Sequence, residues 1–569
     1  MLLTCIVGAW AQSGLGNVPK TVDWRNAHIT DVGVVASDVM LWKMQNSDTH
    51  KLDTLVTSES YILWQSEGDL EEQAEERRAN SDDVVSNHTA KAKAHINGLR
   101  DVKPIAQEGR LQDWLAFFEY YVFLFEYPSV DANGNPVILS AIAACPTKDA
   151  DEVRDVVIGT HITITSDSQR PSARTKGYKE DDWGVLMSLA GGKKMKLGWR
   201  ANLTFGILLP FWPFWAGVGI AAEVKSGDDA FNNNLVILAD YEGYGVTKDR
   251  AHPYLYQELT ARQVVDATRY GIALYKNDPG LADIRHPIRS DFRSISCGYS
   301  QGGSVAMATH RFIEQNGLVD ELHFAGSLCG DGPYDPIATL MYYMKNDLAD
   351  KKMSMPVVLP LIVKGMLDTN PYMKGHKVTD YFQPEFLASG IMQWLTDKVK
   401  STDDITDAWK KTGGIFDKNG CVMMRDVMTP ECYAYFKKLY EDNKDTFTSA
   451  NGVPLPTKRG VFEDLHFALA SNDMTTGWTP QHAILLYHSS DDTVVPYENA
   501  TSAVNRLGGW TTLLTSKDGL DHVPAGTDFF KGKNSTIISN FGIRAYVAKR
   551  QLCELQWNNQ KKGAISEFE

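Results

Sequence analysis

The stretch that decides the fold reads Arg293-Ser-Ile-Ser-Cys-Gly298-Tyr-Ser300-Gln301-Gly302-Gly-Ser-Val-Ala-Met. An apolar run typical of a strand leads directly into Gly-x-Ser-x-Gly, and small residues typical of a closely packed helix follow. A side chain at Gly298 or Gly302 would collide across so sharp a turn. The turn would expose the Ser300 hydroxyl and bring the amide of Gln301 to a helix N-terminus, where it can stabilise developing negative charge. The stretch therefore predicts a serine nucleophile between a strand and a helix.

A serine nucleophile needs a histidine base and an acid that orients the base. When the serine lies on a turn between a strand and a helix, the acid follows the serine in the chain and the histidine comes last. The apolar run 484–487 predicts a strand, and Asp491 and Asp492 follow it. His522 is the last histidine of the chain and comes 30 residues after Asp492, in a predicted loop. Ser300, one of the two aspartates and His522 are thus the candidate catalytic residues.

The other histidines have simpler interpretations. His310 falls in the helix after the serine and is expected to be packed there, and His488 precedes the acid and is expected to shape its loop. His252 and His286 fall in predicted loops and have no partner that the sequence identifies. None of these four residues is predicted to take part in the chemistry.

Strand patterns alternate with helical patterns around the serine motif, which predicts a mostly parallel sheet with helices on both faces. Residues 336–478 break this alternation with amphipathic helical segments, so we expect a largely helical insertion in one sheet domain. The charged segment that precedes the first strand pattern is expected to be helical. The expected divisions are 1–11 (a possible signal peptide), 12–112 (an N-terminal helical region), 113–335 (the first part of the core), 336–478 (a helical cap or lid) and 479–569 (the second part of the core).

The N-terminus predicts export. Residues 2–10 carry no charge, and Ala9-Trp10-Ala11 fits a signal-peptidase site, although no basic residue precedes the apolar run. We therefore expect a secreted or periplasmic protein. A second uncharged run, 201–222, has the length of a membrane span, but Pro210 and Pro213 interrupt it, so no integral membrane span is predicted.

Composition excludes other classes of protein. The chain of 569 residues has 57 Lys and Arg against 71 Asp and Glu, a net charge of −14 that argues against nucleic-acid binding. Seven cysteines without a Cys-x-x-Cys pair predict neither a disulfide scaffold nor a structural zinc site.

The ordered set of motifs resembles the α/β-hydrolases and, more narrowly, the secretory lipase family and its bacterial relatives. The matching segments, in roughly residues 115–550, are 133–140, 159–163, 240–245, 298–302, 330–334, 477–480 and the loops around Asp492 and His522. The resemblance implies an α/β-hydrolase fold with a helical cap.

The same resemblance implies roles for individual residues. Ser300 is the nucleophile and His522 the base, and counting back from Pro496 selects Asp492 over Asp491 as the acid. The backbone amides of Gln301 and Thr163 are the implied oxyanion donors.

The implied activity is a serine esterase or lipase that needs no metal and no organic cofactor. Its implied substrate is a small-molecule ester, a lipid or an acylated sugar.

Two alternatives remain open from the sequence. The same three residues cleave amides in serine peptidases of the prolyl-peptidase type, although those usually carry an N-terminal propeller of repeated strands, which residues 12–112 do not predict. A non-catalytic binding protein on a hydrolase scaffold is the second alternative, because fold alone does not determine function.

Overall fold

The computed structural model describes residues 15–46, 52–64, 102–104, 116–147, 152–153, 155–173, 234–509, 511–516 and 519–531. The predicted signal peptide and the uncharged run 201–222 lie outside these residues. Among the described helices, none combines the length and the apolar character that crossing a bilayer requires.

The described strands form one 11-stranded sheet with the order β11-β10-β9-β8-β6-β7-β5-β4-β1-β2, and β3 pairs with β1. Its parallel part runs from β11 to β7, and the pairs from β7 to β2 are antiparallel. The bounds of the parallel strands are β6 (Asp155–Thr160), β7 (Asn234–Ala239), β8 (Ser294–Tyr299), β9 (Phe324–Gly330), β10 (Ala483–Ser489) and β11 (Thr511–Ser516). Those of the antiparallel strands are β1 (His28–Asn46), β2 (Leu52–Trp64), β3 (Val102–Pro104), β4 (Ala116–Val130) and β5 (Pro136–Thr147).

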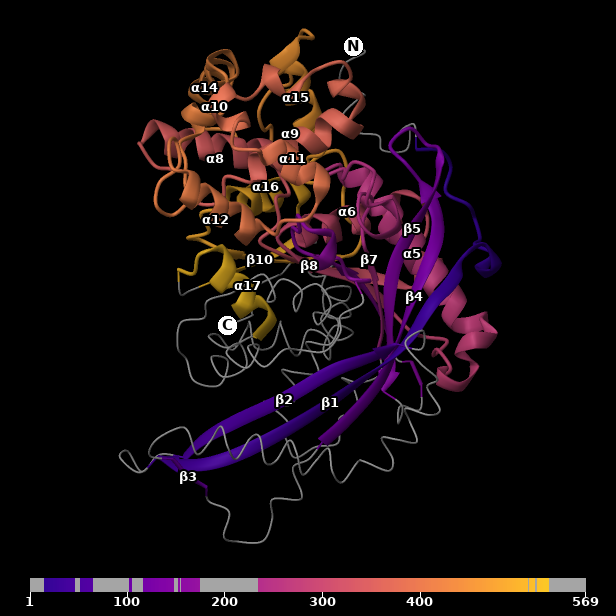
Figure 1. Ribbon diagram of the computed structural model, residues 1–569. Helices are drawn as coiled ribbons and strands as arrows, with labels where there is room; N and C mark the ends of the chain where they lie inside the picture. Colours follow the sequence, from indigo (N-terminus) through magenta and orange to yellow (C-terminus); the bar gives the residue numbers. More distant parts are fainter. Residues whose placement is uncertain are drawn as a thin grey trace.

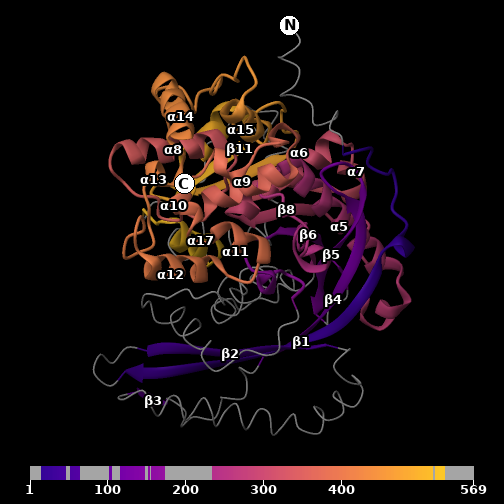
Figure 2. The same cartoon turned by 45° about the horizontal axis from the view of Figure 1, so that its top comes forward.

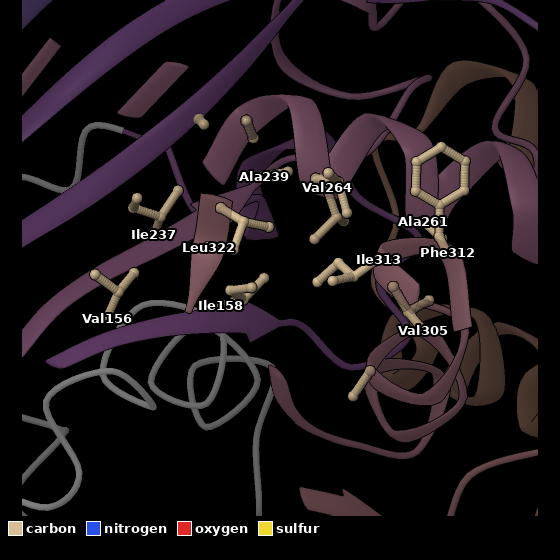
Figure 3. Close-up of a cluster of buried hydrophobic side chains, with 14 of the residues drawn as sticks. Val156, Ile158, Ile237, Ala239, Ala261, Val264, Val305, Phe312, Ile313 and Leu322 are labelled. Atoms are coloured by element: carbon tan, nitrogen blue, oxygen red, sulfur yellow. The ribbon is translucent and has the colours of Figure 1, made fainter. Parts of the chain in front are cut away.

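Helices cover both faces of the parallel strands. On one face, α5 (Gln257–Asn277) and α6 (Gln301–Gln315) enclose a core in which Ile158 and Ile237 lie near Val264 and Ile313 (Figure 3). Side chains alternate along a strand, so Tyr487 of β10 points to the opposite face from Leu486. There the Tyr487 ring lies 5.5 Å from that of Phe529 in α17 (His522–Lys531). The α/β-hydrolase fold is thereby confirmed.

The N-terminal prediction was wrong within the described residues. Where we expected helix in 12–112, the chain forms the long strands β1 and β2 and the short strand β3, which extend the sheet away from the helices (Figure 2). The reason is a partner far away in the sequence. β1 pairs with β4 from His28–Glu126 to Val39–Ala116. Backbone pairing with an existing sheet edge overrides the weak local preference on which the helical prediction depended.

Between β9 and β10 the described chain contains no strand of the sheet, and helices succeed one another. They lie together beside β8 and β10 (Figure 1) and form a second hydrophobic core, with the buried Trp409 stacked on Phe416 at 4.8 Å. Their bounds are α8 (Pro336–Leu348), α9 (Val358–Thr369), α10 (Pro384–Leu387), α11 (Ile391–Asp397), α12 (Thr402–Thr412), α13 (Met424–Val427), α14 (Pro430–Asn443) and α15 (Val461–Ser471). Two further helices lie against parallel strands: α7 (Val319–Leu322) against β9, and α16 (Glu498–Leu507) against the edge strand β11.

Candidate active site

Ser300 lies on a strained turn between β8 and α6. Its φ of 58° and ψ of −126° are sparsely populated by residues other than glycine, and its N–H donates to the Gly330 carbonyl at 2.8 Å. A Cβ atom at Gly298 would lie 2.1 Å from Thr160 Oγ1, and one at Gly302 would lie 2.2 Å from the Thr160 carbonyl oxygen. Neither position has room for a side chain, so the two glycines allow the serine to occupy this turn.

The structure brings together Ser300, Asp492 and His522, three residues from separate loops at the carboxyl ends of strands. Ser300 Oγ lies 2.9 Å from His522 Nε2, and His522 Nδ1 lies 2.5 Å from Asp492 Oδ2. All three residues are buried. His522 is the first residue of α17, so the loop predicted for it ends where this helix begins. The arrangement lets Nδ1–H donate to the carboxylate while Nε2 accepts the serine proton.

Asp492, and not its neighbour, faces the histidine. Its second oxygen, Oδ1, accepts hydrogen bonds from the amides of Val494 and Val495, each at 2.8 Å. Asp491 is exposed to solvent. Two amide donors hold the Asp492 carboxylate in one orientation, with Oδ2 directed at the imidazole.

The surroundings of His522 determine its protonation. Burial by itself lowers the pKa of an imidazole. The charge and hydrogen bond of Asp492, together with the charges of Asp331 and Asp521, outweigh burial and raise the pKa of His522 above its ordinary value. The site therefore stabilises an imidazolium, the form that a base reaches after it has taken a proton.

A cavity of about 130 Å³ adjoins Ser300 and His522. Its wall combines loops of the core with helices α9 and α12. The apolar lining residues are Ile162, Tyr254, Leu255, Pro333, Pro336, Met355, Val358, Ile362, Val494, Val495 and Val523, and the polar ones include Thr163, Thr402 and Asp403. An apolar group bound in this cavity would lie beside the serine hydroxyl.

The two predicted oxyanion donors lie near the serine. Gln301 begins α6, and within the described part of the chain its backbone N–H has no hydrogen-bond acceptor. Thr163 lines the cavity, and its hydroxyl lies 2.9 Å from that of Tyr254. An unengaged amide at a helix N-terminus, next to the serine, suits a developing oxyanion.

The sequence analysis missed His252. Burial lowers the pKa of this residue to about 3, so its imidazole is neutral. Nδ1 lies 2.8 Å from the Glu242 carbonyl oxygen, a contact that requires Nδ1 to be the donor. His252 Nε2 then accepts a hydrogen bond from the side-chain amide of Gln301 at 3.2 Å. His252 thus holds the residue that follows the serine, and no sequence signal connects two residues in separate loops.

Asp331 is a second residue of the site to which the sequence assigned no role. It follows β9 and accepts hydrogen bonds from the Ser489 amide, at 2.8 Å, and from the Tyr299 hydroxyl. The Tyr299 hydroxyl oxygen also lies 2.7 Å from the His522 carbonyl oxygen. Burial, with the charge of Asp492 nearby, raises the pKa of Asp331 to about 6. The site therefore contains two buried carboxyl groups, of which Asp492 touches the imidazole.

No family model matches the chain, and no curated protein matches its sequence. Solved structures are similar to it at low sequence identity. The rice cell wall degrading esterase LipA from Xanthomonas oryzae has 18% identity and a TM-score of 0.48, with 78% of this chain and 91% of that chain covered. A putative hydrolase from Legionella pneumophila has 15% identity and a TM-score of 0.48, with 80% and 93% covered. Candida antarctica lipase A in its closed state has 13% identity and a TM-score of 0.44, with 76% and 78% covered.

Proposed function

We propose that the chain is a serine carboxylic-ester hydrolase of the secretory lipase type. The observation that carries the proposal is the continuous contact from Ser300 Oγ through His522 to Asp492, at 2.9 and 2.5 Å, on a strained serine turn beside an apolar cavity. Ser300 is the proposed nucleophile, His522 the base and Asp492 the acid. Secretion remains a prediction, since residues 1–14 lie outside the described part of the chain.

The proposed reaction is acyl transfer to water. Ser300 Oγ attacks the ester carbonyl carbon while His522 Nε2 takes the hydroxyl proton, and Asp492 stabilises the resulting imidazolium. The negative oxygen of the tetrahedral intermediate accepts hydrogen bonds from the amides proposed as donors, those of Gln301 and Thr163. His522 then protonates the departing alcohol, and afterwards activates the water that releases the acid from the acyl-enzyme.

The lining of the cavity favours an ester with an apolar acyl group. Much of its wall is apolar, and Val358 and Ile362 of α9 and Val494 and Val495 of the loop after Asp492 contribute to it. Burial of an apolar group stabilises binding by about 0.8 kcal/mol for each methylene. A lipid, an acylated sugar and a simple ester all present such a group.

A paired substrate panel tests the proposal. The full chain should hydrolyse p-nitrophenyl esters and leave aminoacyl p-nitroanilides uncleaved. Cleavage of the anilides at a comparable kcat/KM would favour the peptidase alternative. Cleavage of neither substrate class, by protein that is shown to be folded, would favour a non-catalytic binding protein.

Replacement of His252 should weaken turnover more than binding. His252→Ala removes the acceptor of the Gln301 side-chain amide and loosens the residue that carries the proposed oxyanion donor. We expect kcat to fall by roughly tenfold to a hundredfold while KM changes by less than about threefold. Steady-state kinetics on one ester measure both constants. His286→Ala, at a loop histidine that does not line the cavity, is the control and should behave as wild type. A His252→Ala effect confined to KM would contradict this role.

As the pH falls, activity should be lost at a pH above the ordinary pKa of a histidine side chain. His522 must be neutral to accept the serine proton, and its pKa lies above 6.5, so activity is lost as the pH falls through that raised value. We expect kcat/KM for a non-ionising ester to fall below an apparent pKa that exceeds about 6.5. The rate of fluorophosphonate labelling should follow the same limb, since it needs the same base. An acid limb at pH 5, in both assays, would contradict the assignment.

A further inference from the structure

Three side chains of the metal-ligating type meet outside the proposed active site. His310 and Glu314 lie one turn apart on α6, and His482 lies directly before β10. The candidate ligand atoms, His310 Nε2, Glu314 Oε1 and His482 Nδ1, all lie within 4.8 Å of one another. His310 is fully buried, and the side chains of Glu314 and His482 are 7% and 13% exposed.

Three nitrogen atoms converge on a single carboxylate oxygen. Glu314 Oε1 lies 3.0 Å from His310 Nε2, 2.7 Å from His482 Nδ1 and 2.9 Å from the Gln481 backbone nitrogen. The other oxygen, Oε2, has the Gln481 nitrogen at 3.1 Å. A carboxylate satisfied by hydrogen bonds alone can distribute its donors over both oxygens. Here both imidazole nitrogens approach the same oxygen, so the three candidate ligand atoms form one compact cluster.

We propose that His310, Glu314 and His482 bind one divalent transition-metal ion of the zinc type. Two imidazole nitrogens and one carboxylate oxygen are a common donor set for zinc. Calcium, which takes six to eight oxygen ligands, does not fit this set. The ion would join α6, which begins directly after Ser300, to the segment that leads into β10 and Asp492.

The spacing of the ligand atoms suits a tetrahedral ion. Bonds of about 2.0–2.1 Å in tetrahedral geometry separate two ligand atoms by about 3.3 Å. The distances from Glu314 Oε1 to the two imidazole nitrogens, 3.0 and 2.7 Å, would have to grow by about 0.3 and about 0.6 Å to reach this spacing. Water would complete the coordination from the side of His482, the most exposed of the three ligands.

A hydrogen bond to Ser327 can orient His310 as a metal ligand. His310 Nδ1 lies 2.9 Å from the Ser327 hydroxyl, which can accept the Nδ1 proton and leave the Nε2 lone pair free for the ion.

The test uses the full chain, freed of any affinity tag, stripped with a chelator and titrated with Zn²⁺. We expect one Zn²⁺ per chain by calorimetry and elemental analysis, and a Tm that rises by several degrees on saturation. His482→Asn and Glu314→Gln should each weaken binding at least tenfold and abolish the Tm shift. His376→Asn is the matched control, because His376 is another histidine paired with a carboxylate, that of Asp464 at 2.9 Å, and it should bind as wild type. Absence of stoichiometric binding to the wild type would overturn the proposal, as would undiminished binding in both variants.

Substitution by Co²⁺ gives a readout that does not depend on stability. The wild type should develop the visible absorption of a tetrahedral Co²⁺ centre, and His482→Asn should not. His482 is the most exposed of the three ligands, so its replacement is expected to leave the chain folded, which ester hydrolysis can check. Equal cobalt spectra in the wild type and His482→Asn would overturn the proposal.

Discussion

Ser300→Ala should abolish ester hydrolysis. Without Oγ no acyl-enzyme forms, and we expect kcat to fall by about six orders of magnitude, to the background that binding and the oxyanion donors support. Initial rates on a p-nitrophenyl ester measure the loss. Labelling by a fluorophosphonate, followed by mass spectrometry of the labelled peptide, should place the adduct on Ser300 in the wild type and find none in the variant.

The control for this prediction is Ser471→Ala. Ser471 ends α15, where its hydroxyl donates to the Ala468 carbonyl at 2.8 Å, and its removal should leave both assays unchanged. The strained turn should persist in Ser300→Ala, because the backbone N–H of residue 300 donates to the Gly330 carbonyl and alanine keeps that N–H. Ester hydrolysis that persists in Ser300→Ala, with labelling at another serine, would overturn the proposed nucleophile.

Asp492→Asn should lower kcat by about four orders of magnitude. An amide at this position can still receive the hydrogen bonds of Val494 and Val495 through its oxygen, but it then presents NH₂ to His522 Nδ1. The imidazole is driven into the tautomer that carries its proton on Nε2, where it cannot accept the serine proton. Steady-state kinetics measure the loss, and circular dichroism checks that the variant is folded.

Two matched variants make this prediction specific. Asp491→Asn changes the adjacent, exposed carboxylate and should leave kcat within about twofold of wild type. Asp331→Asn changes the other buried carboxyl group, which contacts Tyr299 and not the imidazole ring. A large loss in Asp331→Asn together with near-normal activity in Asp492→Asn would mean that the acid follows β9, not β10.

The sequence predicted much of the candidate site because its signals are local. A glycine on either side of Ser300 reports a turn that only small residues can form, and the structure has that turn. The strand before Asp492 and the position of His522 as the last histidine left few alternatives, and the structure brings both residues to Ser300. The parallel part of the sheet was likewise predicted, because buried parallel strands are continuous apolar runs.

The errors and omissions concern partners that are far apart in the sequence. A helix was expected where β1 forms, because only its pairing with β4 makes the strand favourable. His252 had no partner in the sequence, although the fold brings it to Gln301, 49 residues away. Nor did the sequence connect Glu314 with His482, which lie 168 residues apart.

By itself, then, the sequence determined the serine turn, the order of the three proposed catalytic residues and the class of fold. These features depend on backbone stereochemistry and strand periodicity, which neighbouring residues set. Only the tertiary structure decided which carboxylate faces His522, what holds Gln301, and that two histidines converge on Glu314. Those relations depend on where separate strands end within one sheet. Packing over the whole chain sets these positions, and no local pattern encodes them.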